Sequence, residues 1–455
     1  MNTYIDEIRI GKALENSENV DKNKVGEIIE KSRECRGITL EEAACLINSD
    51  DSELQHQLFD AARYIKDKIY GKRVVLFAPL YISNECTNNC LYCSFRMENK
   101  EIARKTLTYG EIVNETKAIE AQGHKRILLV CGEHPQKTHI EFITEAVAAI
   151  YSNTGIRRIN VNAAPMEVED FKKLKSSSIG TYQLFQETYH LDTYKKMHPS
   201  GQKADYYYRV TAMERALEAG IDDVGIGALL GLYNYKFEIL ATLNHIENLE
   251  KKFGIGPHTI SVPRLRPADD WKLGSVPHSV SNDDFRKIVA VFRLAVPYTG
   301  IILSTRESSK FRDELLSLGV SQISAGSSTS VGGYKEKTES DDQFHISDHR
   351  SLPEVLEAIC RKGYIPSFCT SCYRRNRTGE VFMGYAKEGE IHEFCQPNAI
   401  LTFKENLLDY GTPGLIKLGE EIIRKALGEI QDQNIKRVTV QKLKEIENGE
   451  RDIFF

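Results

Sequence analysis

The sequence predicts an α/β protein built on a (β/α)8 TIM barrel, with an N-terminal helical extension and a mainly helical C-terminal domain. From residue 71, eight short runs rich in β-branched residues alternate with amphipathic helical stretches, which is typical of a parallel barrel. Three cysteines, Cys86, Cys90 and Cys93, directly follow the first run. The 455 residues exceed the about 250 of such a barrel and leave room for extensions at both ends.

Residues 1–70 form the predicted N-terminal extension. Apolar residues recur there at helical spacing, and Thr39 and Glu42 have the spacing of a capping box. The expected helices are 5–14, 24–35, 43–47 and 53–66. No residue pattern in this part indicates chemistry, so we expect it to pack outside the barrel.

Residues 71–335 form the predicted barrel. The expected strands are 74–82, 126–131, 157–162, 181–187, 223–229, 259–264, 300–304 and 322–324. The expected helices are 109–122, 139–151, 206–219, 235–251, 282–295 and 309–318. In a barrel of this kind the working groups lie at the C-terminal ends of the strands, which is where the first cysteine loop falls.

Residues 336–455 form the predicted C-terminal domain. Two glycines and a polar stretch, 332–343, indicate a loop or linker before it. Helices are expected at 352–361, 401–410 and 415–427, and a second group of cysteines lies between the first two of them.

Composition and charge exclude several classes of function. The formal net charge of −5 gives no reason to expect nucleic acid or an anionic membrane as a partner. No run of about 18 apolar residues occurs, and residues 1–17 lack the apolar core of a signal peptide, so we expect a soluble, cytoplasmic protein. Ten cysteines in that compartment indicate metal or redox chemistry. The scattered ones, Cys35, Cys45, Cys131 and Cys360, are expected to be small buried hydrophobes.

The first cysteine group predicts an iron–sulfur cluster. Spacings of three and two residues let the thiolates of Cys86, Cys90 and Cys93 converge from one loop. Three thiolates on a 4Fe-4S cube leave one iron open to a small molecule. A structural zinc site is the alternative, but it normally needs a second Cys or His pair, and none lies nearby in the sequence.

The second group is Cys369, Cys372 and, twenty-two residues later, Cys395. A zinc site completed by His392 and a dithiol redox pair that leaves Cys395 unused are both alternatives. The match to the first group favours a second three-thiolate 4Fe-4S cluster. The adjacent basic run, 373–377, would offset the negative charge of such a cluster, bind an anion, or form a solvated loop.

The first loop resembles the radical S-adenosylmethionine (SAM) superfamily, because an aromatic residue, Tyr92, precedes the last cysteine of the C-x3-C-x2-C motif. In that superfamily the open iron binds the amino and carboxylate groups of SAM. Three further features resemble the superfamily. A glycine and a glutamate follow the second strand, the fifth strand contains two glycines, and a glutamate ends the fourth strand, with an arginine on the helix after it. These candidate SAM-binding residues are Gly132, Glu133, Gly225, Gly227, Glu187 and Arg209. Cys131 stands where the superfamily has a further glycine.

Further stretches are similar to the aromatic amino-acid lyase branch, which contains the tyrosine lyase ThiH and the FeFe-hydrogenase maturase HydG. These stretches are 183–190, 197–199, 256–263, 303–307 and 324–327. The C-x2-C-x22-C pattern is found in HydG and not in ThiH. Over residues 30–455 the chain therefore resembles the HydG family.

The resemblance implies a reaction. A 5′-deoxyadenosyl radical formed from SAM takes hydrogen from the amino group of L-tyrosine, which divides into p-cresol and dehydroglycine. Dehydroglycine becomes carbon monoxide and cyanide on an additional iron, held at the auxiliary cluster through a bridging free cysteine. The expected partners are L-tyrosine, an electron donor and other hydrogenase maturation proteins.

His258 and Arg306 are the remaining candidates. The resemblance makes His258 a ligand to the additional iron, since imidazole suits iron; otherwise it is a structural residue at the start of the sixth strand. Arg306, after the seventh strand, can pair with the tyrosine carboxylate, or form an ion pair with Glu307 or Glu187. Arg264 and Arg266 are alternatives for the same role.

Two active sites require a polar passage through the barrel, because cyanide and dehydroglycine would otherwise be lost to water. Three alternative functions stay open. They are a lyase that stops at dehydroglycine, an iron–sulfur carrier, and a radical enzyme whose C-terminal module binds zinc.

Overall fold

The computed structural model describes residues 4–335, 342–375, 377–388 and 391–455. Half of the predicted linker, 336–341, lies outside this part. None of the described helices is long and apolar enough to cross a membrane.

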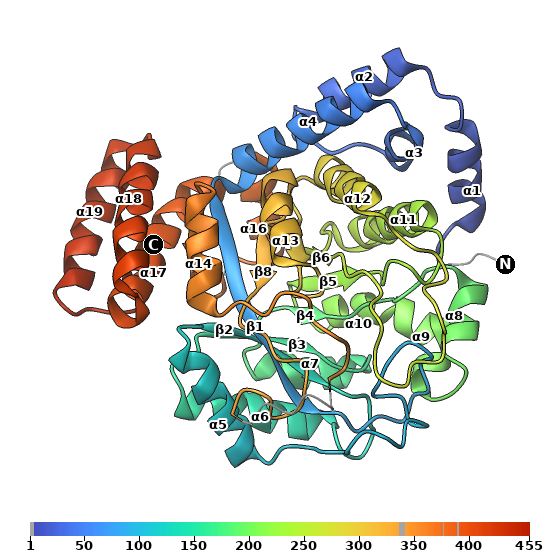
Figure 1. The fold of residues 1–455 in the computed structure, drawn as a ribbon, viewed down its shortest axis with the longest axis horizontal. Helices are drawn as coiled ribbons and strands as arrows, with labels where there is room; N and C mark the ends of the chain where they lie inside the picture. The colour runs from blue at the N-terminus through green and yellow to red at the C-terminus, as the bar shows by residue number, and fades with distance from the viewer. Residues whose placement is uncertain (1–3, 336–341, 376, 389–390) are drawn as a thin grey trace.

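A closed barrel of eight parallel strands forms the centre of the molecule, as predicted (Figure 1). The strands follow one another in chain order, and β1 closes the barrel by pairing with both β8 and β2. They are β1 Arg73–Ser83, β2 Arg126–Cys131, β3 Arg158–Asn162, β4 Tyr182–Gln183, β5 Val224–Gly227, β6 Thr259–Ser261, β7 Gly300–Leu303 and β8 Gln322–Ser324.

Helices surround the barrel. They are α5 Tyr109–Ala121, α6 Ile140–Asn153, α7 Val168–Ser176, α8 Leu191–Met197, α9 Tyr206–Val210, α10 Ala212–Glu218, α11 Tyr235–Phe253, α12 Asn282–Ala295 and α13 Ser309–Leu315, with 3-10 turns at Gln202–Ala204 and Leu316–Leu318. The predicted capping box is present at the start of α5, where Thr108 and Glu111 exchange hydrogen bonds.

Some predicted boundaries were wrong. The expected strands 181–187 and 259–264 are shorter, because the chain leaves the ladder early and keeps only the isolated bridges Glu187–Ala228 and Leu230–Arg264. The expected helix 206–219 breaks at Thr211 into α9 and α10. Helix α7 was not predicted.

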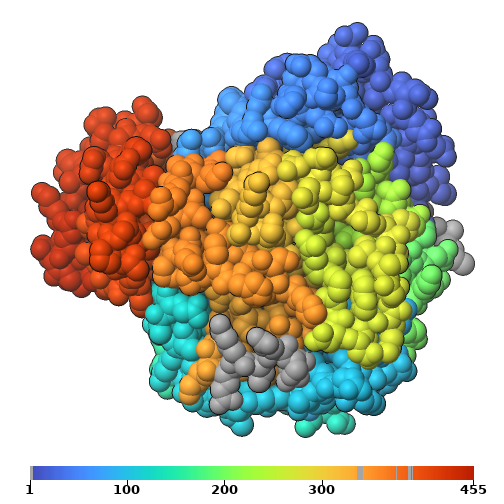
Figure 2. Space-filling view, in the orientation of Figure 1, coloured from blue at the N-terminus to red at the C-terminus, as the bar shows by residue number. Residues whose placement is uncertain are grey.

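The N-terminal helices pack on one side of the barrel, as Figures 1 and 2 show. They are α1 Glu7–Asn16, α2 Lys22–Ser32, α3 Leu40–Asn48 and α4 Ser52–Tyr70, close to the predicted spans. Helix α4 lies against α12, and α3 lies against α11. This extension buries the outer face of the barrel, and its last residue, Tyr70, lines the second of the two cavities described below.

The C-terminal part begins with α14 Leu352–Arg361, at the predicted bounds, and then adds an unpredicted strand, β9 Ile365–Ser367. Strand β9 pairs in parallel with the first three residues of β1. The remaining helices are α15 Ser371–Arg374, α16 Gly379–Glu388, α17 Ile391–Tyr410, α18 Pro413–Glu429 and α19 Gln433–Glu447. The last three form a lobe beside the barrel (Figures 1 and 2).

A buried carboxyl group fixes the chain after β4. Glu238 on α11 is fully buried, and its side chain accepts hydrogen bonds from the Thr188 hydroxyl and, at 2.9 Å, from the Tyr189 N–H. Among the described residues it has no ion-pair partner. Burial therefore raises the pKa of Glu238 from 4.5 to about 7.

We expect Glu238→Gln to change how stability depends on pH. The folded protein keeps a proton on Glu238 that the unfolded chain releases near pH 4.5, so this group lowers the free energy of unfolding as pH rises from about 4.5 to 7. Glutamine can still accept from the Tyr189 N–H through its amide oxygen and can donate its amide N–H to the Thr188 hydroxyl oxygen. It removes the decline, which is on the order of 3 kcal/mol. Urea unfolding at pH 5 to 8 measures it. Parallel pH curves for the variant and the wild type would contradict the assignment.

Candidate active sites at the two mouths of the barrel

The first cysteine loop leaves the C-terminal end of β1 and is held by Arg104. The Arg104 guanidinium donates to four backbone carbonyls of the loop, at 2.6 to 3.0 Å. The loop also hydrogen-bonds to the chain after β2, through Thr87 N–H to the Glu133 carbonyl at 2.9 Å. The loop is therefore fixed by the protein itself.

Cys86, Cys90 and Cys93 all line one cavity of about 170 Å³ inside this mouth. Burial raises the pKa of all three thiols, to about 11 for Cys93. Neutral thiols in such a place need a bound metal to become thiolates. No described group of three His, Cys, Asp or Glu side chains is close enough to hold a single metal ion. A cluster several ångströms across does not require that closeness.

Tyr92 is held beside the cysteines by His198. The Tyr92 hydroxyl lies 2.8 Å from His198 Nε2, and His198 Nδ1 lies 2.8 Å from the Tyr194 carbonyl. A carbonyl can only accept, so Nδ1 carries the hydrogen and Tyr92 donates to Nε2. Burial, with Lys203 and Arg209 nearby, lowers the pKa of His198 well below its usual value and keeps it neutral.

The candidate SAM-binding residues form one buried ionic network. Arg209 Nη1 lies 2.9 Å from Glu133 Oε1, and Lys203 Nζ lies 2.6 Å from Glu187 Oε1. Arg209 Nη2 is 3.7 Å from the same Glu187 oxygen. Burial by itself would raise the pKa of Glu133, but the charges of Arg209 and Lys203 outweigh it and lower that pKa.

Backbone shape explains the glycines of this mouth. A Cβ at Gly132 would lie 2.3 Å from the Glu85 carbonyl oxygen, and one at Gly227 would lie 2.7 Å from the Ser261 carbonyl oxygen. At Gly225 it would meet the Thr259 hydroxyl at 2.5 Å. Glu187 has a φ of 72°, in the left-handed region, where a non-glycine residue is held only by its surroundings. A larger side chain at any of the three glycines would therefore require the neighbouring chain to move.

Arg306 lines the same cavity. Its guanidinium lies 3.2 Å from the centre of the Phe344 ring, and burial lowers the pKa of Arg306 to about 10. The expected alternative ion pairs are not formed within the described residues. Glu307 instead pairs with Arg264 and, at 2.8 Å, with Arg266.

Cys369, Cys372 and Cys395 line a second cavity, of about 50 Å³, at the N-terminal mouth of the barrel. Strand β9 leads to Cys369, and α15 and α17 carry the other two. The neighbouring Cys372 thiol, together with the charges of Arg73 and Arg377, lowers the pKa of Cys395, although burial opposes it. His392, the proposed zinc ligand, has a side chain outside the described part.

His258 lines this second cavity. His258 directly precedes β6 and therefore lies at the N-terminal end of that strand. Cys369, Cys372 and Cys395 lie at this same end of the barrel, whereas the first site lies at the opposite end. The His258 ring centre lies 4.4 Å from that of Phe382, and its buried Nδ1, 3.6 Å from Asp223 Oδ1, has no hydrogen-bond partner among the described residues.

Three arginines that sequence reasoning missed lie at the second cavity: Arg73 and Arg126 line it, and Arg158 packs against Tyr373, which lines it. Arg73, Arg126 and Arg158 begin β1, β2 and β3, are at most 9% exposed, and each has a buried Nε without a partner among the described residues. Arg126 donates to the Cys369 carbonyl at 2.8 Å, and Arg158 lies 3.2 Å from the Tyr373 ring centre. Each arginine is the first residue of its strand. An arginine at the start of three successive strands was the sequence signal that could have indicated a positively charged N-terminal mouth.

Comparison with known proteins agrees with this geometry. Residues 80–246 match the radical SAM superfamily, and residues 261–365 match the biotin and thiamin synthesis associated domain. The 2-iminoacetate synthase of Escherichia coli K12 is 32% identical over 340 residues, which cover 74% of this chain and 89% of that protein.

Two solved structures are similar over almost the whole chain. A crystal structure of HydG, described as a maturase of the FeFe-hydrogenase, has a TM-score of 0.97 and 52% identity and covers 99% of this chain and 100% of that one. HydG from Carboxydothermus hydrogenoformans has a TM-score of 0.86 and 44% identity, covering 96% and 97%. The chain therefore belongs to the HydG family of radical SAM enzymes, the FeFe-hydrogenase maturases related to 2-iminoacetate synthase.

Proposed function

We propose that this protein cleaves L-tyrosine to p-cresol and dehydroglycine at the first site and converts dehydroglycine to carbon monoxide and cyanide at the second. The observation that carries the proposal is the pair of three-cysteine sets, which line cavities at opposite mouths of one barrel. The products would serve assembly of the hydrogenase H-cluster.

The donor set of the first cavity fits a 4Fe-4S cluster with SAM. Cys86, Cys90 and Cys93 would hold the cluster, which with SAM supplies a 5′-deoxyadenosyl radical that takes a hydrogen atom from tyrosine. Glu133 and Glu187 carry negative charge toward the SAM amino group, while Lys203 and Arg209 balance that charge in the buried network. Tyr92, fixed by His198, would pack beside SAM. Gly225 and Gly227 leave room for its adenine.

Arg306 would bind the tyrosine carboxylate. It is the candidate arginine whose guanidinium lies in the cavity without a carboxylate partner in the described part of the chain. Arg264 and Arg266 are already neutralised by Glu307. A planar guanidinium matches a carboxylate with two parallel hydrogen bonds, which orients the amino group as well as binding it.

The second cavity fits a thiolate-bound cluster and an anionic substrate. Cys369, Cys372 and Cys395 would supply three ligands. Arg73 and Arg126 add buried positive charge to the same cavity, and Arg158 adds more behind Tyr373. His258 offers a nitrogen to an additional iron carried by a bridging free cysteine. The atoms of dehydroglycine equal those of carbon monoxide, hydrogen cyanide and water together, so this conversion needs no external oxidant.

The predicted passage is not open between these two cavities, which share no lining residue. Polar side chains lie at their boundary. Gln183 lines the first and Gln322 the second, and Gln183 Nε2 is 3.5 Å from Thr259 Oγ1. A Cβ at Gly300 would lie 2.9 Å from Gln322 Nε2 and 3.4 Å from Thr259 Cγ2. Movement of these few side chains would open the passage that the reaction needs.

The proposed reaction also defines partners. Cleavage of SAM and reduction of the phenolic fragment to p-cresol each consume an electron, so an electron donor is required. Other maturation proteins would receive the product. We propose a cytoplasmic location, where both thiol sets stay reduced.

The decisive test is an anaerobic assay of the reconstituted protein with SAM, a reductant and L-tyrosine. We expect p-cresol, carbon monoxide and cyanide. A Cys369/Cys372/Cys395→Ala variant should keep p-cresol formation and lose both diatomic products, because only the second site is removed. A Cys86/Cys90/Cys93→Ala variant should form none of the three.

Other outcomes of the assay identify the alternatives. p-Cresol with only glyoxylate from the wild type would indicate a lyase that stops at dehydroglycine. Loss of zinc, instead of iron and sulfide, from the second cysteine variant would indicate a zinc module. Cleavage of SAM without consumption of tyrosine would mean that the protein is a radical SAM enzyme that acts on a substrate other than L-tyrosine.

We expect Arg306→Lys to raise the KM for tyrosine about 10- to 100-fold, because lysine keeps the charge but loses the paired hydrogen bonds. The matched control is Arg266→Lys, which changes a guanidinium engaged by Glu307. Steady-state p-cresol formation measures both variants. A raised KM in the control alone would transfer the role to Arg266.

We expect Thr259→Leu to obstruct the passage without harming the first site. p-Cresol formation should be unchanged, while carbon monoxide and cyanide fall and glyoxylate rises, because dehydroglycine escapes to water. Thr259→Val, which keeps the size of threonine, is the control and should retain most of the diatomic products. Unchanged product ratios in Thr259→Leu would exclude this route.

A further inference from the structure

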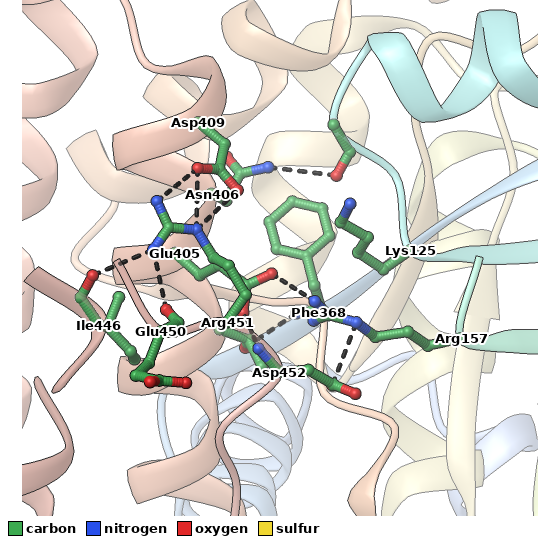
Figure 3. A network of polar contacts seen from close by, with 12 residues as sticks. Lys125, Arg157, Phe368, Glu405, Asn406, Asp409, Ile446, Glu450, Arg451 and Asp452 are labelled. Carbon is green, nitrogen blue, oxygen red and sulfur yellow. Dashed lines mark hydrogen bonds and ion pairs between the residues drawn. The ribbon is translucent and has the colours of Figure 1, made fainter. Parts of the chain in front are cut away.

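The segment 451–455, which follows α19, lies against the part of the chain that carries Cys369 and Cys372. Figure 3 shows how it is attached at its start. Arg451 pairs with Asp409 on α17 at 2.7 Å and donates to the carbonyl of Ile446 at 3.0 Å. The segment is thereby turned back from α19 toward the barrel.

Asp452 joins three separate parts of the fold. Its Oδ1 lies 3.1 Å from Arg157 Nε, beside the start of β3, and 2.9 Å from Arg374 Nη2, at the end of α15. Its Oδ2 lies 2.5 Å from Arg374 Nη1, and its N–H donates to Glu405 on α17 at 2.8 Å. Arg157 also pairs with Glu405, at 2.6 Å (Figure 3). Two arginines and two carboxylates thus form a network, which holds better than an isolated surface pair.

Phe455 continues the attachment as far as a cysteine sulfur. Its N–H donates to Asn398 Oδ1 at 2.8 Å, and its carbonyl accepts from Arg377 at 2.6 Å. Asn398 Nδ2 and Arg377 both lie within 3.3 Å of the Ser371 hydroxyl. That hydroxyl is 3.3 Å from Cys369 Sγ. A continuous chain of hydrogen bonds therefore runs from the segment to a candidate cluster ligand.

The segment with the two cysteines has little regular structure of its own. Helix α15 contains four residues, and a helix of one turn is not stable in isolation. Cys369 and Cys372 are only half-buried. The guanidiniums of Arg374 and Arg375 also lie over the Phe454 ring, at 4.1 and 5.3 Å from its centre. The local order of this stretch must come from contacts such as these.

We propose that residues 451–455 are a positioning element of the second cysteine site. They hold Cys369 and Cys372 toward Cys395, and through Asn398, Arg377 and Ser371 they set the hydrogen bonding of the Cys369 sulfur. Hydrogen bonds to ligand sulfurs tune the affinity and potential of a cluster. The inference rests on the proposed function in one respect: the second cysteine set must bind a cluster.

The test uses Asp452→Asn in a full-length Cys86/Cys90/Cys93→Ala background, so that only the second cluster contributes. Asp452 has a φ of 61°, which asparagine tolerates, so the variant removes charge without backbone strain. The matched control is Glu421→Gln, which breaks an exposed pair with Lys425 on α18. Iron and sulfide content after anaerobic reconstitution, and the midpoint potential of the cluster, are measured.

We expect Asp452→Asn to retain about half of the iron and sulfide of its background or less, and to shift the potential of what remains. Glu421→Gln should match the background in both. If Asp452→Asn fails to fold, as circular dichroism would show, Phe454→Leu removes only the ring beneath Arg374 and Arg375, and the same shift is expected.

Failure of the inference and failure of the proposed function give different results. Iron content and potential equal to those of Glu421→Gln, in Asp452→Asn and in Phe454→Leu, would overturn the inference. In the same background, additional Cys369/Cys372/Cys395→Ala substitutions must abolish iron binding. If iron stays bound, the second cysteine set is not a cluster site, and the proposed function fails first.

Discussion

The pairing of β1 with its neighbours is the constraint on which both sites depend. This strand of eleven residues is completely buried and pairs with β2, β8 and β9 at different points along its length. Its C-terminal end opens into the first cysteine loop, and its N-terminal end receives β9, which leads to Cys369. At about 3.3 Å per residue the two ends lie roughly 33 Å apart. One strand therefore fixes the separation of the two cysteine sites.

The two mouths of the barrel differ in how their buried charges are neutralised. At the first, carboxylates and cations neutralise one another, with Glu133 on Arg209 and Glu187 on Lys203. At the second, Arg73 and Arg126 line the cavity with the thiols, and Arg158, which lies over Tyr373, is near the carboxylate of Asp223. Uncompensated buried charge is costly. The first mouth thus contains buried groups of both signs, whereas positive charge predominates among the charged residues described at the second.

Sequence patterns predicted the barrel and most of the first site because these depend on local signals. Eight apolar runs marked the strands, and the spacing of Cys86, Cys90 and Cys93 marked the loop. Lys203 and Arg104 were missed because their partners are set by folding, and a lysine or arginine in a loop has no distinguishing pattern. Strand β9 is three residues long, too short for any period to show. The sequence placed His258 at the start of the sixth strand but could not show which mouth the second cysteines occupy, because that depends on β9.

The two cysteine segments also differ in what keeps them ordered. The first is tied by Arg104, eleven residues after Cys93, so its order is local and forms with the loop itself. The second is tied by β9, by Asn398 on α17 and by Asp452, about eighty residues away in the chain. Contacts between distant residues form only after the parts that carry them have folded. The second site is therefore complete only when the C-terminal lobe has docked, whereas the first can exist as soon as the barrel closes.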